Sequence, residues 1–132
     1  MHKTEGGFTS LLYRRLIAAT GFSIQGLKSC FRYEEAFRVE VFLGVALSPL
    51  GFYIAASGQD LALLFGAMFI VLIAELLNSA IEAVVDLVSP EKAELAGRAK
   101  DQASAAVMLS MVLFAGVWAL LAWQNLAAVA GK

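Results

Sequence analysis

Nineteen consecutive residues without a charged side chain separate Glu40 from Asp60. A helix of about 20 predominantly apolar residues is long enough to cross the hydrocarbon core of a bilayer. Two further apolar runs follow: the first contains one ionisable residue before Ile81, Glu75, and the second is uncharged over 102–131. The sequence therefore predicts three membrane-spanning helices, approximately over 41–59, 61–86 and 98–126.

The amino-acid composition is typical of a membrane protein rather than a soluble one. Of 132 residues, 60% are hydrophobic and 16% are charged, against roughly 25% charged in an ordinary soluble domain, and the mean hydropathy is +0.75. Ten Lys and Arg residues balance eleven Asp and Glu residues, so we expect no nucleic-acid partner. The single cysteine, Cys30, excludes an intrachain disulfide and multi-cysteine zinc sites, and His2 is the only histidine. Any metal is therefore expected to be a hard cation held by carboxylates.

The first forty residues carry ten charged side chains, too many for a membrane span or a secretory signal. Over 11–33, apolar residues recur at helical spacing between basic ones, which predicts an amphipathic helix on the membrane surface. We expect this helix to be broken or bent near Gly21 and Gly26, and the first span to bend near Pro49. The expected fold is an all-α membrane protein, a single membrane-embedded domain over 1–132 in which an interfacial helix precedes three transmembrane helices.

Basic residues indicate the orientation in the membrane. Six of the ten precede the first span and three lie in the 87–101 loop, whereas Asp60 is the only charged residue between the first and second spans. The positive-inside rule then places the N-terminus and the 87–101 loop in the cytoplasm.

Glu75 lies within an apolar span, where a carboxylate is costly and is therefore a candidate functional group. On a helix, Glu82 and Asp86 fall within about 40° of Glu75, and Asn78 lies about 60° to one side. Glu75 is about 10 Å from Glu82 along the axis, so it lies deeper in the membrane. The second span thus has an acidic face that approaches the cytoplasmic boundary.

Two more polar clusters are expected at the same boundary, one over 34–40 and one over 91–101. Carboxylates can hold a hard cation and basic residues can neutralise phosphate, and Mg²⁺ commonly combines one or two carboxylates with substrate phosphates. This mixture favours phosphoryl transfer at the lipid surface. Two other interpretations are a structural role for the acidic face and a small proton- or ion-coupled transporter subunit in which Glu75 carries the ion.

Four segments of the sequence are distinctive: AELLNSAIEAVVDLV at 74–88, ELAGRAKDQASAAV at 94–107, EEAFRVE at 34–40 and RLIAATGF at 15–22. Together they resemble the prokaryotic integral-membrane diacylglycerol kinases, and the 74–88 segment is the most specific match. The resemblance implies a homotrimer of three-span subunits, with sites shared between neighbours, that phosphorylates a lipid alcohol with Mg²⁺ and ATP. By position, Glu75 would be the general base.

The resemblance also implies roles for other residues. Glu34 and Glu82 would hold the metal together with the nucleotide phosphates, Asn78 would support this arrangement, and Ser104 would lie near the lipid substrate. The remaining positions that match nucleotide contacts of the family are Arg15, Phe22, Glu91, Lys92, Ala93, Lys100 and Asp101.

The implied reaction phosphorylates diacylglycerol to phosphatidic acid at the cytoplasmic face of the bacterial inner membrane. The same residues fit an undecaprenol kinase, because groups that transfer a phosphoryl group do not report the identity of the lipid chain.

Overall fold

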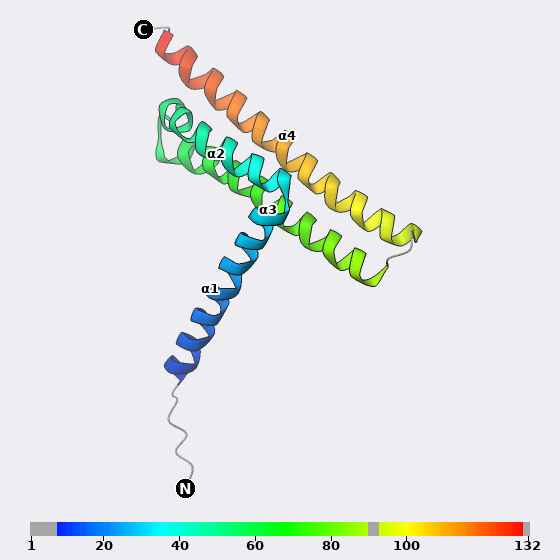
Figure 1. Ribbon diagram of the computed structural model, residues 1–132. Helices are drawn as coiled ribbons and strands as arrows, with labels where there is room; N and C mark the ends of the chain where they lie inside the picture. The colour runs from blue at the N-terminus through cyan, green and yellow to red at the C-terminus, as the bar shows by residue number, and fades with distance from the viewer. Residues whose placement is uncertain (1–7, 90–92, 131–132) are drawn as a thin grey trace.

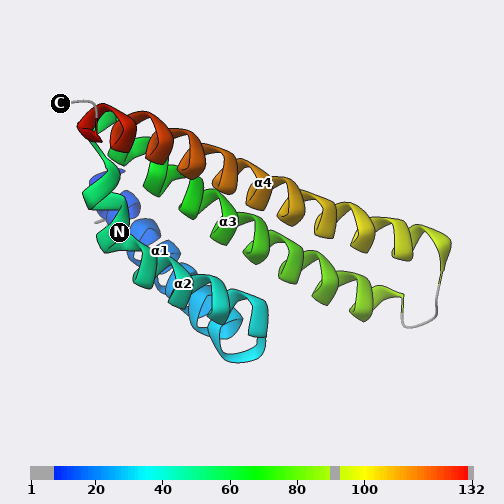
Figure 2. The same cartoon turned by 90° about the horizontal axis from the view of Figure 1, so that it is seen from above.

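The computed structural model describes residues 8–89 and 93–130, and every regular element in this part of the chain is an α-helix. The helices are α1 (Phe8–Tyr33), α2 (Glu35–Ile54), α3 (Gly58–Val88) and α4 (Glu94–Ala130). Neighbouring members of the α2–α3–α4 bundle run antiparallel, whereas α1 projects away from them (Figure 1, Figure 2). By length and composition α2, α3 and α4 can cross a membrane, which confirms the three predicted spans.

Helix α1 is continuous through Gly21 and Gly26, so the expected break is absent. A glycine within a helix costs only about 1 kcal/mol relative to alanine, which the rest of a 26-residue helix can absorb. Helix α2 also continues through Pro49. The placement of α1 on the membrane surface stays a prediction.

The turn between α2 and α3 lies inside the stretch where one uninterrupted span was predicted. The Ser57 hydroxyl accepts a hydrogen bond from the Asp60 N–H (3.2 Å), and the Asp60 carboxylate accepts one from the Ala56 N–H (2.9 Å). This reciprocal arrangement resembles a capping box and starts α3 at Gly58. As a result α2 ends at Ile54, five residues before the expected end of the first span at 59.

The three spanning helices differ in length. The 20 residues of α2 extend about 30 Å, close to the thickness of the hydrocarbon core, whereas the 31 residues of α3 and the 37 of α4 extend about 46 and 55 Å. The paired α3 and α4 therefore continue well beyond the junction of α1 and α2 (Figure 1). Polar residues on this extension can lie outside the apolar core of the membrane.

The buried core lies toward the opposite end of the bundle, around Ile54, Leu64, Trp118 and Leu121. The Trp118 indole N–H donates to the Leu64 carbonyl (3.1 Å), and Gly51 allows the indole ring to pack closely against α2. Elsewhere many large apolar side chains remain exposed, for example Trp123 at 79%. These surfaces fit a molecule covered by lipid or by other subunits.

Candidate active site

Glutamates from two segments gather where α1 joins α2. Glu34 is the residue between these helices, and its Oε1 accepts a hydrogen bond from Ser79 Oγ of α3 (3.0 Å). One turn before Ser79, the Glu75 side chain is buried, with 6% of the residue exposed, and it interacts electrostatically with Glu34 and Glu82. The structure thus places Glu75 near both Glu34 and Glu82.

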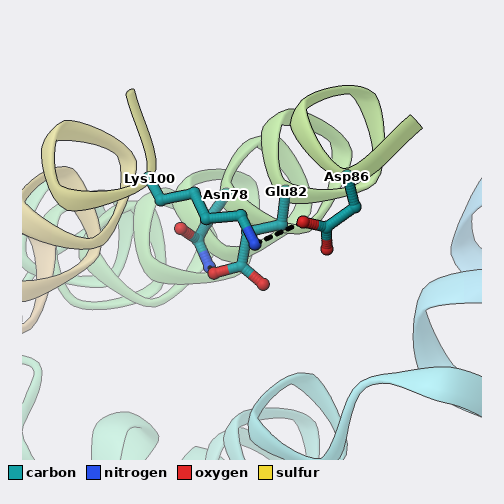
Figure 3. Close-up of polar contacts among 4 residues, drawn as sticks. All are labelled: Asn78, Glu82, Asp86 and Lys100. Carbon is teal, nitrogen blue, oxygen red and sulfur yellow. Dashed lines mark hydrogen bonds and ion pairs between the residues drawn. The ribbon is translucent and has the colours of Figure 1, made fainter. Parts of the chain in front are cut away.

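A polar row continues along α3 toward its C-terminal end (Figure 3). Asn78 Nδ2 donates to Glu82 Oε1 (3.4 Å), whereas Asn78 Oδ1 is buried and has no hydrogen-bond partner among the described residues. From α4, Lys100 reaches across to α3, where its Nζ donates to Asp86 Oδ1 (2.6 Å) and interacts electrostatically with Glu82. Helix α4 therefore places the positively charged Lys100 side chain beside Glu82 and Asp86 of α3.

Glu40 is a further carboxylate beside the site. It interacts electrostatically with Glu75, and both of its carboxylate oxygens are buried without a hydrogen-bond partner in the described part of the chain. Among the described residues, Glu40 is also the only charged one that lines an apolar cavity of about 280 Å³ between α2, α3 and α4. The other lining residues are Leu43, Gly44, Leu47, Met68, Val71, Leu72, Met111 and Phe114.

The end of α1 contributes Cys30. The residue is buried and its thiol lies beside the Ser79 hydroxyl. Burial raises the pKa of the thiol, and the nearby carboxylates of Glu34 and Glu75 act in the same direction. Cys30 is therefore held as a neutral thiol next to the acidic cluster.

Arg15 and Phe22 lie apart from this cluster within one chain. Both are exposed on α1, Phe22 at 70%, and α1 points away from the bundle (Figure 1). Measured along the helix from Cys30, Phe22 is about 12 Å away and Arg15 about 22 Å away. The continuous form of α1 prevents either residue from folding back to Lys100 of the same chain.

The remaining candidates lie on or just before α4. Asp101 and Ser104 are exposed, and Ser104 follows Lys100 by one turn on the same helix face. Ala93 directly precedes α4, where its carbonyl accepts a hydrogen bond from the Gly97 N–H (3.1 Å). The last two candidates, Glu91 and Lys92, lie outside the described residues.

Sequence reasoning gave no role to Glu40, Ser79 or Cys30. The segment 34–40 drew attention to Glu40 as part of a charged group, but nothing local indicated that its oxygens would be buried. Ser79 lies within the 74–88 segment that resembles the family, but the resemblance gives it no role of its own, and Cys30 carries no recognisable signal. Their place beside the site depends on a contact between α1, α2 and α3 that only the folded chain forms.

The fold and the site define a class: a membrane protein with three spans, in which buried carboxylates and a lysine gather toward one end of the bundle. A model of the family described as prokaryotic diacylglycerol kinase matches residues 21–122. This chain belongs to that family, which confirms the resemblance seen in the sequence.

Individual relatives cover nearly the same length. A diacylglycerol kinase of Haemophilus influenzae is 43% identical over 118 residues, which cover 89% of this chain and 95% of the relative. One of Pseudomonas aeruginosa is 43% identical over 106 residues, covering 80% and 86%. One of Escherichia coli K12 is 37% identical over 125 residues, covering 95% and 98%.

Proposed function

We propose that this chain transfers the γ-phosphoryl group of ATP to the hydroxyl group of diacylglycerol and so produces phosphatidic acid. The family makes the chain a kinase, with ATP as co-substrate. The structural observation that carries the proposal is the buried Glu75 carboxylate, which interacts electrostatically with Glu34 and Glu82, in a chain that aligns with almost the full length of known diacylglycerol kinases.

Glu75 is the general base in this proposal. It takes the proton of the lipid hydroxyl as that oxygen forms a bond to the γ-phosphorus, while the bond from this phosphorus to the bridging oxygen of ADP breaks. Lys100 neutralises phosphate charge, and Asn78 orients Glu82 through the hydrogen bond between them. Such a transfer depends on positioning and charge neutralisation and needs no covalent enzyme intermediate.

Glu34 and Glu82 are the proposed ligands of Mg²⁺. No group of three His, Cys, Asp or Glu side chains within 8–89 and 93–130 is arranged to hold a metal ion by itself. Mg²⁺ typically takes one or two carboxylates and completes its shell with water and substrate phosphates. Glu34 and Glu82 each use one oxygen in an internal hydrogen bond and have a second oxygen to offer. When bound, the cation would offset charge on the phosphoryl group being transferred.

The cavity beside Glu40 supports a lipid alcohol as substrate. The cavity residues on α3 precede Glu75 in the chain. The cavity therefore lies on the side of Glu75 that faces the Asp60 end of the bundle. A substrate with an apolar body and a hydroxyl head can occupy such a place with its head toward Glu75. Ser104, which is exposed on α4, is the second proposed contact to the lipid.

We further propose a homotrimer in which a neighbour completes each site. A groove of about 700 Å³ between α3 and α4 includes Asn78, whose Oδ1 has no partner in the described chain. Small residues such as Ala74, Ala103 and Ala106 line this groove and let another helix approach closely. A neighbour would also bring its own Arg15 and Phe22 toward the nucleotide, to which Asp101 and the 91–93 segment would contribute from α4 and the preceding loop.

The proposed location is the bacterial inner membrane, with the N-terminus and the site on the cytoplasmic side. The distribution of basic residues supports this orientation through the positive-inside rule. ATP is then available on the side of the membrane where Lys100 lies.

The proposal is tested by following ADP release from purified protein in mixed micelles with diacylglycerol, with undecaprenol or with no added lipid alcohol. Stimulation by diacylglycerol that requires Mg²⁺ is the expected result. A preference for undecaprenol would retain the chemistry and change the substrate. Folded protein that neither lipid stimulates would contradict the kinase proposal and favour a test of Glu75 as an ion site.

A further inference from the structure

Ser79 connects the carboxylate cluster to the junction of α1 and α2. Its hydroxyl donates to Glu34 Oε1 (3.0 Å) across 45 positions of sequence, and the buried Cys30 thiol lies beside the same hydroxyl. A hydroxyl has one hydrogen. That hydrogen is given to Glu34, so Ser79 ties α3 to the residue between α1 and α2.

Glu34 needs such a support because of its position. It lies between two helices with an extended backbone (φ −101°, ψ 116°), and its side chain makes no capping hydrogen bond to α2. The bond from Ser79 is the one hydrogen bond of the Glu34 side chain within the described residues. A glutamate has three rotatable side-chain bonds, and holding it in one orientation costs conformational entropy.

Electrostatics adds to this need. Glu34 and Glu75 interact as like charges when both are ionised, which favours rotation of Glu34 away from the cluster. The Ser79 hydrogen bond opposes that rotation. Half-buried Ser79 is thus placed to decide whether Glu34 stays close enough to Glu75 and Glu82 to act with them.

We propose that Ser79 is a positioning residue, which holds the Glu34 carboxylate in place to capture the nucleotide-bound cation. The inference rests on the proposed function, because it takes Glu34 as a ligand of the cation. It assigns no chemical step to Ser79.

The first test compares Ser79→Ala with Ser79→Thr, which restores a hydroxyl. Ser48→Ala is the matched control, because the half-buried Ser48 hydroxyl donates only within its own helix, to the Gly44 carbonyl (2.7 Å). Mn²⁺ binding to the full-length protein in micelles is followed by electron paramagnetic resonance, with a non-hydrolysable ATP analogue and Mn²⁺ replacing Mg²⁺. The same variants are assayed for activity against Mg²⁺ concentration at saturating ATP.

We expect Ser79→Ala to weaken Mn²⁺ binding about tenfold, the lower end of the effect of removing an outer-shell partner of a metal ligand. The Mg²⁺ concentration for half-maximal activity should rise by a similar factor, with a smaller loss of maximal rate. Ser79→Thr should stay within about twofold of the wild type, and Ser48→Ala should match it.

The second test is a double-mutant cycle. If Ser79 acts only through Glu34, Ser79→Ala should add nothing to the loss of Mn²⁺ binding that Glu34→Gln causes alone. Additive losses in the double variant would overturn the positioning role of Ser79.

Unchanged Mn²⁺ binding by folded Ser79→Ala, or equal losses in Ser79→Ala and Ser79→Thr, would overturn the role of Ser79. Either result can be obtained with a wild-type protein that phosphorylates diacylglycerol normally, so the proposed function would stand. Folded wild type without Mg²⁺-dependent kinase activity would instead remove the basis of both proposals.

Discussion

The two ends of the α2–α3–α4 bundle differ in how their polar groups are satisfied. At the turn from α2 to α3, Asn125 Nδ2 of α4 donates to both Asp60 Oδ2 (2.8 Å) and the Ile54 carbonyl (3.1 Å). Toward the other end, the described residues leave both carboxylate oxygens of Glu40 and Oδ1 of Asn78 buried without a partner. We call the end with Asp60 and Asn125 the closed end, because the chain itself provides hydrogen-bond partners for its polar groups. The end with Glu40 and Asn78 is the open end, where these partners are missing among the described residues.

This difference suggests separate tasks for the two ends: the Asp60 end stabilises the fold, and the Glu40 end binds substrate, cation or another subunit. A buried polar group without a hydrogen bond costs on the order of 1–3 kcal/mol. Such groups are expected where a substrate, a cation or another subunit supplies the missing partner. The predictions below test this division, first at the open end and then at the closed end.

Replacing the buried carboxylate at the open end should have the largest effect. Glu75→Gln keeps the size of the side chain and removes its ability to accept a proton, so kcat should fall about 10³-fold, within the usual contribution of a general base. The assay is phosphorylation of diacylglycerol in mixed micelles. Glu35→Gln, at an exposed carboxylate in the first turn of α2, is the control and should keep its activity. A fully active Glu75→Gln protein would end the assignment of Glu75 as base.

Loss of the Lys100 charge should lower the rate of the reaction more than loss of its ion pair with Asp86. Lys100→Met keeps the length of the side chain without its charge and should lower kcat/KM for ATP about 10²-fold, as when one group that stabilises transition-state charge is lost. Asp86→Asn should change kcat/KM less than about threefold, because Asp86 is 67% exposed and such pairs contribute little.

Lys28→Met, at an exposed lysine of α1, serves as the control for the loss of a positive charge. Equal losses in the Lys100 and Asp86 variants would show that the ion pair acts as a structural link between α3 and α4.

At the closed end, a substitution should change stability and leave catalysis intact. Asn125→Ala removes the donor to the buried Ile54 carbonyl and should lower the free energy of unfolding by about 1–2 kcal/mol. Unfolding in mixed micelles with increasing denaturing detergent measures this, and kcat should remain within about twofold. The neighbouring exposed Gln124, changed to alanine, should alter neither quantity. A large loss of kcat in Asn125→Ala would argue against independent ends.

The sequence was sufficient for features that depend on local patterns. The length of the uncharged runs predicted three spans, because a membrane-crossing helix needs little more than length and apolar composition. Helical spacing placed Glu75 and Glu82 on one face of α3, since that relation is fixed by 3.6 residues per turn. Both follow from residues close together in the chain.

The features that sequence reasoning missed depend on tertiary contacts. The contact between Glu34 and Ser79 joins residues 45 positions apart, and the burial of Glu40 follows from the packing of α2 against α3 and α4. The end of α2 differs from the expected end of the first span for another reason. The uncharged stretch continues through the turn 55–57, so its length does not reveal the Ser57 cap that starts α3 at Gly58.

The smallest expected effect concerns the close packing at the closed end. In Gly51→Ala the new Cβ would lie 3.1 Å from the Trp118 ring, which the hydrogen bond to the Leu64 carbonyl hinders from moving away. Overpacking should outweigh the gain in helix propensity and lower the free energy of unfolding by about 0.5–1 kcal/mol. Gly66→Ala is the matched control, because no heavy atom outside its own stretch of helix lies within 4 Å of its new Cβ, and this variant should be neutral or slightly more stable. If Gly51→Ala stabilised the protein as much as Gly66→Ala, the closed end would be loosely packed, and its contrast with the open end would then lie in hydrogen bonding alone.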